Sequence, residues 1–244
     1  MSIEPGTGYY EGSIAIVCAS LLLIIFYLIT ECKPVMGFFL KRHRDDKAQI
    51  WKVLFNRLAG VFILGIVPIV LIPVVIRRPF LDFGMDTETL FQSLLVWIPT
   101  SALVIILAYF MTRRKSFLAR YPQIRAGEWD IGLISLSALS WIVYLAGYEM
   151  FFRGFLLFAC YSSFGFWPAI FINIVLYMLA HIPKGSLETF GSIPLGFFFC
   201  YITLQIGSIW FALFTHITIA LANEWFSIYH NTGMKVLPLK RSGR

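Results

Sequence analysis

Long apolar runs dominate the chain, and its polar residues gather in the short segments between them. Several runs reach about 18 residues or more without a charged side chain, which is enough for a helix to cross a bilayer. Apolar and polar residues do not alternate within the runs, as they would in the strands of a membrane barrel. The pattern therefore predicts an all-α fold, a polytopic transmembrane helical bundle of about seven spans, within a range of six to eight. The predicted helices cover residues 12–31, 54–76, 91–111, 131–158, 166–181, 191–206 and 208–228.

Two of these predicted helices differ from a simple span. Pro68 and Pro73 lie inside the run 54–76, and prolines are tolerated in spanning helices but often kink them. The run 131–158 would be about 42 Å long at the usual rise of about 1.5 Å per residue, which is more than a bilayer needs. We therefore expect this helix to tilt, break or protrude.

Composition agrees with the pattern and limits the kinds of partner. Of the 244 residues 59% are hydrophobic, and the mean hydropathy is +0.78. The net charge of +7 could indicate a nucleic-acid partner, but the basic residues gather in segments 33–52 and 113–125 and in the tail. Short basic loops between apolar runs are typical of cytoplasmic loops. The expected partners are membrane lipid and a protein or peptide substrate, with no nucleic acid.

The distribution of basic residues also predicts an orientation. Seven helices place the segments 33–52 and 112–130 and the C-terminal tail on one side, and all three are basic. The positive-inside rule then puts that side in the cytoplasm and the N-terminus outside. We expect a multi-pass protein of a prokaryotic plasma (inner) membrane with a cytoplasmic C-terminus. The basic pair Arg77 and Arg78 does not fit this distribution.

Four ionisable side chains inside apolar runs are the candidates for function: Glu149, Arg153, His181 and His216. A charged group at the centre of a membrane helix costs about 2.5–3.5 kcal/mol on insertion scales, so such residues usually have a functional role. Glu149 and Arg153 are four residues apart and can form an ion pair on one helix face. We expect the carboxylate and the two imidazoles to meet at one water-filled pocket shielded from lipid.

Other intramembrane chemistries lack their sequence patterns here. The chain has no H-E-x-x-H zinc motif, no G-x-S-x-G serine turn and no Gly-Asp pair. Its four cysteines include no C-x-x-C pair, so neither a zinc ribbon nor a disulfide framework is indicated.

Three segments together resemble the motifs of the CPBP family. They are Tyr148-Glu149-x-x-x-Arg153-Gly154, Tyr177-x-x-x-His181, and the run from Leu204 to Trp210 that leads to His216. The family pattern is E-E-x-x-x-R, F-x-x-x-H and H-x-x-x-N, and the family includes type 2 CAAX prenyl endopeptidases and bacteriocin-processing and immunity proteins. The resemblance divides the chain into residues 1–130 with three helices and basic loops, a CPBP-like region 131–228 and a basic tail 229–244.

The resemblance implies an intramembrane endopeptidase that cleaves a membrane-associated or lipidated protein or peptide with an activated water. Glu149 is then a base or water-orienting group paired with Arg153. His181 is a general base or ligand, and His216 an oxyanion donor or ligand. No cofactor is certain. A divalent metal such as zinc stays open, with Glu149, His181 and His216 as its candidate ligands.

This sequence differs from the family pattern at three positions. Tyr148 stands at the first glutamate, Tyr177 at the phenylalanine and Ala220 at the asparagine. Glu149 is about 100° around the helix from position 148 and does not take its place, and Tyr148 itself is expected to pack. A catalytically inactive scaffold, immunity or chaperone protein is therefore the alternative function, and a transporter is a third. For Glu149 and Arg153, the alternative role is a structural ion pair.

Overall fold

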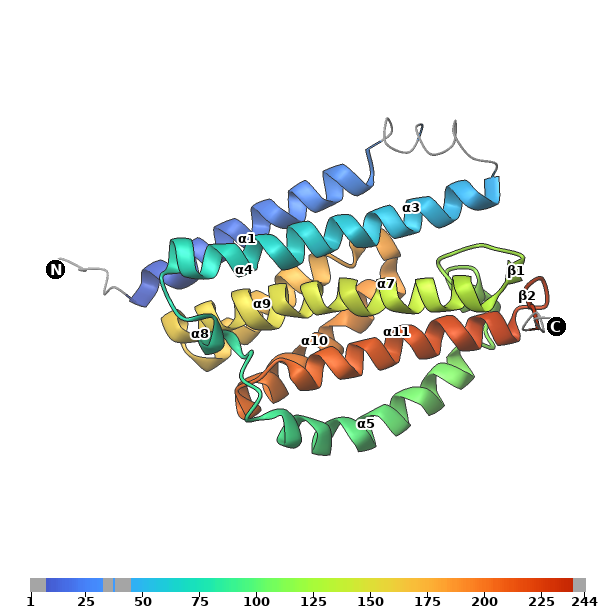
Figure 1. Ribbon diagram of the computed structural model, residues 1–244. Coiled ribbons are helices and arrows are strands. Elements are labelled where there is room, and N and C mark those ends of the chain that lie inside the picture. Colours follow the sequence, from blue (N-terminus) through green and yellow to red (C-terminus); the bar gives the residue numbers. More distant parts are fainter. Residues whose placement is uncertain (1–7, 33–36, 38–44, 239–244) are drawn as a thin grey trace, which may run out of the picture.

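The computed structural model describes residues 8–32, 37 and 45–238, and it is mostly helical (Figure 1). Six helices in the described residues are long and apolar enough to cross a membrane, and α9 is a shorter apolar helix. The chain is thus an integral multi-pass membrane protein, as the sequence predicts. The main α-helices, some of which join end to end into one span, are α1 (Gly8–Thr30), α3 (Asp45–Gly60), α5 (Leu90–Met111), α7 (Ile131–Glu149), α8 (Leu157–Phe164), α9 (Phe166–Leu179), α10 (Ser186–Ile206) and α11 (Trp210–His230).

Two of the spans contain π-helical turns. The α3 helix continues through the π-helix η1 (Val61–Ile66), α4 (Val67–Leu71) and the π-helix η2 (Ile72–Ile76), with Pro68 and Pro73 in its second half. Proline removes a backbone donor and crowds the carbonyl four residues earlier, and a wider turn relieves both effects. The second such span joins α7 to α8 through the π-helix η4 (Met150–Leu156).

Several predicted boundaries need correction. The helix predicted at 191–206 begins at Ser186, and the helix predicted at 12–31 begins at Gly8. The helix predicted at 54–76 begins at Asp45, and the helix predicted at 131–158 continues to Phe164. The helix predicted at 166–181 ends at Leu179, because Pro183 begins a 3₁₀ turn, η5 (Ile182–Lys184), for which His181 is the N-cap residue. His181 therefore lies in a turn after α9 rather than on its last helical position.

Short elements at one end of the bundle join the loop 112–130 to the C-terminal segment. These are α6 (Lys115–Leu118), β1 (Glu128–Trp129) and β2 (Lys235–Val236), whereas the 3₁₀ helix η3 (Phe80–Phe83) lies at the other end. β1 and β2 pair in parallel, and the Lys235 amide donates to the Gly127 carbonyl at 2.8 Å. The end of α1 and the start of α3 lie at the same end (Figure 1). The predicted basic residues at 33–36 and 38–44, with Lys240, Arg241 and Arg244, lie outside the described residues.

The opposite end brings together the start of α1, the loop after η2 and the end of α8. Arg78 pairs with Glu11 at 3.4 Å and with Asp82 at 2.9 Å, and the Ser162 hydroxyl donates to Glu11. These carboxylates neutralise Arg78, so this part of the basic pair is compatible with the predicted orientation.

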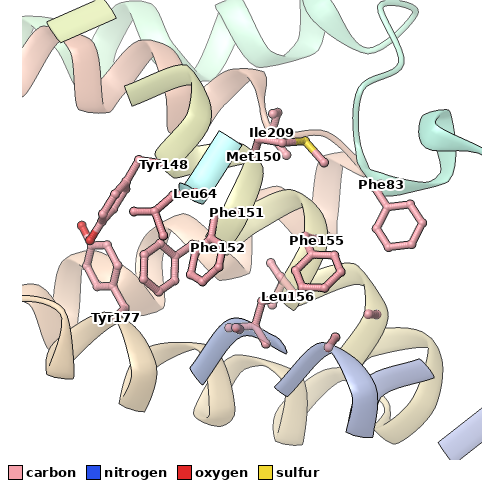
Figure 2. Packing of buried hydrophobic residues seen from close by; sticks show 14 of the residues in the cluster. Leu64, Phe83, Tyr148, Met150, Phe151, Phe152, Phe155, Leu156, Tyr177 and Ile209 are labelled. Atoms are coloured by element: carbon pink, nitrogen blue, oxygen red, sulfur yellow. The ribbon is translucent and has the colours of Figure 1, made fainter. Parts of the chain in front are cut away.

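The central element is the continuous helix α7–η4–α8. All seven residues of η4 are buried, and their side chains meet residues from the loop after η2 and from η1 (Figure 2). α8 packs against α1, and α7 packs against both η1 and α11. α5 lies against the side of α11 that faces away from α7 (Figure 1). The middle of the α7–α8 span is therefore the best-shielded part of the bundle.

A buried polar network holds α3, α7 and α11 together. Arg57 forms an ion pair with Glu224 at 3.3 Å and donates to the Ser137 carbonyl at 3.0 Å. Glu224 also accepts from the Ser137 hydroxyl at 2.6 Å and from the Trp141 indole at 2.8 Å. Since every carboxylate oxygen has a donor, this charge is well compensated in a low-dielectric interior. The network fixes α11 against α7 and so helps to set where His216 lies.

Candidate functional site

The first part of the site is the ion pair predicted from the sequence. Glu149 is the last residue of α7, and Arg153 lies one turn further on in η4. The Arg153 Nε lies 3.4 Å from the Glu149 Oε2, and both side chains are completely buried. The predicted pairing of these two residues is confirmed.

Glu149 has a second partner from another helix. Its Oε1 lies 2.5 Å from the Nδ1 of His216, which is on α11. The carboxylate thus bridges a guanidinium and an imidazole. A carboxylate that accepts from one ring nitrogen fixes the orientation of the imidazole and stabilises positive charge on it, which leaves Nε2 as the nitrogen available to a substrate or water.

Arg153 is enclosed by aromatic rings. Its guanidinium carbon lies 4.2 Å from the ring centroid of Tyr177 and 5.2 Å from that of Phe199. Within the described part of the chain, none of its three nitrogens makes a hydrogen bond that meets ordinary geometry. The buried cation is therefore held by the Glu149 charge and by ring faces.

His181 is held by the backbone of the preceding helix. Its Nδ1 lies 2.8 Å from the carbonyl oxygen of Tyr177, which can only accept, so Nδ1 carries the hydrogen. Burial, and then the positive charge of Lys184, lower the pKa of His181 from its ordinary value. The ring is therefore neutral at pH 7, and its Nε2 is a free acceptor.

Tyr148 stands between the two imidazoles. Its ring centroid is 5.6 Å from that of His216 and 6.4 Å from that of His181, and both contacts are edge-to-face. A cavity of about 460 Å³ lies against this group, with walls from α5, α7, α9, α10, α11 and two connecting segments. Around the imidazoles it is lined by Tyr148, Tyr177, His181, His216 and Ala220.

The structure brings Glu149, His181 and His216 together, but the carboxylate does not face the cavity as predicted. His181 and His216 face one cavity, as expected. Glu149 is fully buried behind His216, and the side chain of α7 that reaches the cavity at this level is Tyr148. Adjacent helix positions point about 100° apart, so only one of the two can face the cavity.

Sequence reasoning missed two residues of the cavity wall. From the sequence, Tyr148 is expected to pack, and Tyr177 is a mild change from the phenylalanine of the family pattern. The structure places both phenols beside the imidazoles. A signal was present for Tyr177, since residues four apart share a face and His181 follows it by four. For Tyr148 the signal was its position, since it stands at the first glutamate of the family pattern.

Further along the cavity, a polar group lies at the end where the loop 112–130 is found. The Tyr121 hydroxyl donates to Glu188 on α10 at 3.3 Å, and Lys184 lines the same wall. Burial lowers the pKa of Lys184, while the negative charge of Glu188 opposes this shift. The cavity thus has a charged rim and a largely apolar wall.

The donors at the site do not fit a zinc ion. The His, Cys, Asp and Glu side chains of the described residues form no group of three or more that could hold a metal. A catalytic zinc site usually has three protein ligands and a water. Here both Glu149 oxygens face protein cations or donors, and each imidazole has only its Nε2 left. The arrangement is suited instead to general acid–base chemistry by two imidazoles.

Comparison with known proteins finds one match. Residues 130–222 match the family model described as Type II CAAX prenyl endopeptidase Rce1-like, and this range holds both imidazoles, the ion pair and both phenols. No curated protein and no solved structure matches the chain. The family resemblance read from the three motifs is therefore confirmed over this region, which includes every predicted site residue.

Proposed function

We propose that this protein is an intramembrane endopeptidase of the kind that its family match describes, and that it hydrolyses a peptide bond within the cavity. The observation that carries the proposal is the pair of imidazoles, His181 and His216, facing one cavity with a carboxylate behind the second ring. Glu149 and Arg153 support the site from behind. A structural ion pair that holds this helix to its neighbours would also contact His216 on α11, so the cleavage rates of the histidine variants decide between the two roles.

In this mechanism His216 is the general base. Its Nε2 takes a proton from water while the water oxygen bonds to the carbonyl carbon and the carbonyl π electrons move to oxygen. The Glu149 carboxylate stabilises the imidazolium that forms, and Arg153 balances that carboxylate. The Nε2 of His181 accepts the other hydrogen of the water and orients it.

The second step breaks the peptide bond. The oxyanion re-forms the carbonyl, the C–N bond breaks, and His216 donates its proton to the departing amine nitrogen. The base is thereby restored. His216 suits both roles because its Nδ1 stays bonded to Glu149 while its Nε2 exchanges a proton, whereas both oxygens of Glu149 are engaged.

The shape of the cavity favours a membrane-associated substrate. Its walls include Leu107 of α5 and Leu187 of α10, which are each more than half exposed. An apolar cavity that continues to a lipid-facing surface admits a chain from the bilayer with little desolvation cost. We propose that the end with the loop 112–130 faces the cytoplasm, so the charged rim of the cavity lies on that side.

A purified-protein assay tests the function. Wild type and the variants His181→Ala and His216→Ala are compared on membrane-anchored reporter peptides in proteoliposomes. We expect both variants to lose about 10²-fold or more in cleavage rate, the usual contribution of a positioned acid or base. His230→Ala is the matched control, because that ring lies at the end of α11 and contacts Thr112 rather than the cavity. Equal rates in all four proteins would remove the proposal.

The inactive scaffold is the second candidate, and the cavity itself supplies its argument: Tyr148 and Ala220 stand on the wall where the family pattern has a glutamate and an asparagine. It predicts that wild type is inert and that Tyr148→Glu with Ala220→Asn creates cleavage. If wild type cleaves the reporter and the double variant does not, the protein is an enzyme and the scaffold function is refuted.

A further inference from the structure

Two buried phenol groups on the cavity wall have no hydrogen-bond partner. Tyr148 is 4% exposed and Tyr177 is fully buried, and among the described residues neither hydroxyl makes a hydrogen bond of ordinary geometry. The Arg153 guanidinium is the polar group beside the Tyr177 hydroxyl, and because it can only donate, the O–H of Tyr177 stays available as a donor. Their rings are 6.0 Å apart and edge-to-face. In Figure 2 their hydroxyl ends point toward one another. A buried hydroxyl without a partner costs about 1–3 kcal/mol, so two of them side by side call for a ligand.

These hydroxyls lie where the proposed reaction takes place. The Tyr148 ring contacts both imidazoles, and the Tyr177 ring centroid is 4.5 Å from that of His181. Two other hydroxyl groups on the wall are already engaged: Ser192 donates to the Thr189 carbonyl, and Tyr121 donates to Glu188. Ala220 has no side-chain donor. The two phenols are thus unpartnered hydroxyls on rings that contact the imidazoles.

We propose that Tyr148 and Tyr177 form the binding site for the carbonyl oxygen of the scissile peptide bond, and that both hydroxyls donate to it as it becomes an oxyanion. This inference rests on the proposed function. No proton leaves either phenol: the proton taken from water goes to His216, and the two O–H groups stabilise the charge on oxygen until the carbonyl re-forms. The chain has thereby replaced an amide donor at position 220 with phenols at positions 148 and 177.

Neighbouring residues hold the Tyr177 phenol in place and make it a better donor. Arg153 lies over its ring at 4.2 Å, and a positive charge near a phenol strengthens the O–H as a donor. On the other side the ring lies against Gly196, where a Cβ atom would come within 3.0 Å of it. A donor that is already fixed needs no reorganisation during the reaction, which is what makes oxyanion stabilisation effective.

The first test is kinetic. Tyr148→Phe and Tyr177→Phe remove only the hydroxyls and keep the rings. We expect each to lower kcat by about 10²-fold with KM nearly unchanged, because the donors act mainly on the transition state. Tyr161→Phe, on a half-exposed tyrosine of α8, is the control and keeps the wild-type rate. Wild-type kcat in both cavity variants overturns the inference and leaves the proposed function standing.

The second test does not require turnover. The probe is an acetylated apolar tetrapeptide difluoromethyl ketone, whose hydrate carries a tetrahedral carbon, compared with the matched peptide that has a methylene in place of the carbonyl. We expect wild type to bind the ketone at least tenfold more tightly than the methylene peptide, and each Tyr→Phe variant to lose most of that preference. Equal binding of the two peptides by wild type would falsify the inference.

The two tests separate the failure of each proposal. Preferential ketone binding that depends on the phenols, without any cleavage, supports the carbonyl site and refutes the endopeptidase. Cleavage that depends on His216 but not on the phenols supports the endopeptidase and refutes the carbonyl site. Thermal unfolding in detergent shows whether a variant has a folding defect. If Tyr177→Phe has one, Tyr177→Trp replaces it, because tryptophan keeps an aromatic ring but carries its N–H donor at a different position from the tyrosine hydroxyl.

Discussion

At the scale of single residues, the most consequential arrangement is the carboxylate of Glu149 between Arg153 and His216. All three side chains are buried or nearly so, and the Glu149 carboxylate is stabilised by its contacts with Arg153 and His216. Breaking a buried ion pair from one side leaves an uncompensated charge, whereas removing both partners does not. The ion pair and the acid–base chemistry are therefore one unit, and their contributions can be separated only with paired substitutions.

A double-mutant cycle on this pair gives the first prediction. Arg153→Met should lower the free energy of unfolding by about 3–5 kcal/mol, because Glu149 then keeps a buried charge without its cation. The double variant Glu149→Gln with Arg153→Met should recover part of that loss. Thermal unfolding in detergent measures both. Glu149→Gln alone should also reduce cleavage by about 10²-fold by removing the negative charge behind His216. Additive losses in the cycle would show that the two side chains act independently.

At the scale of elements, the position of Tyr148 is set by how closely α7 approaches the first π-helix. Gly147 lies against Gly65 of η1, and a Cβ atom on Gly65 would come within 2.9 Å of the Gly147 Cα. Small residues at such crossings let two membrane helices approach closely. The path of α7 just before the ion pair therefore depends on both contact residues, Gly65 and Gly147, being glycines.

The second prediction follows from this crossing. Gly65→Ala should lower the free energy of unfolding by about 1–3 kcal/mol, the usual cost of overpacking, because backbone atoms cannot move aside as a side chain can. It should also reduce cleavage, since Tyr148 follows Gly147 directly. The matched control for stability is Gly191→Ala on α10, where the added Cβ meets open space. Stability of Gly65→Ala equal to that of the control would mean that the crossing is looser than the structure shows.

The π-helix η4 is the second element-scale device. It begins directly after Glu149, and Asn173 of α9 donates to the Phe152 carbonyl inside it. Asn173 in turn accepts from the Cys200 thiol of α10 at 3.2 Å. A π turn changes which residues share a face beyond it, and such turns are frequent at functional sites. Here it turns Arg153 toward Tyr177 and Phe199 while keeping the salt bridge to Glu149.

At the scale of the whole molecule, the site belongs to no single part of the chain. The predicted division at residue 130 separates the α5 wall of the cavity from the walls that carry the imidazoles. α5 packs against α11 and leaves most of its surface exposed. The bundle therefore needs its N-terminal helices to close the cavity, although the family match begins at residue 130.

The orientation in the membrane gives the third prediction. Glu88 and Glu128 are exposed residues at opposite ends of the bundle. In a background where the four native cysteines are replaced, Glu88→Cys should react with a membrane-impermeant maleimide added to intact cells. Glu128→Cys should react only after the cells are permeabilised, because its loop carries the basic residues that stay in the cytoplasm. The opposite labelling pattern would reverse the proposed orientation.

The sequence alone determined the helical segments, the distribution of charged loops and one salt bridge of this protein. Apolar length predicted about seven spans, and the described residues contain six helices long enough to cross a membrane and one shorter apolar helix. Basic loops indicated which ends lie together, and a spacing of four predicted the salt bridge between Glu149 and Arg153. These features depend only on neighbours along the chain. The place of His181 and His216 inside apolar runs marked them as candidates, and the resemblance to a three-part motif then implied roles for them.

Tertiary structure decided which of these groups face the cavity. Helix 131–164 carries apolar residues on all sides, so its sequence does not indicate which face meets the other helices. Packing of Gly147 on Gly65 and the π turn after Glu149 set that rotation, and they turned Tyr148 inward and Glu149 toward His216, 67 residues away. In a membrane the rotation of a helix is set by contacts with its neighbours, and those contacts exist only in the assembled bundle.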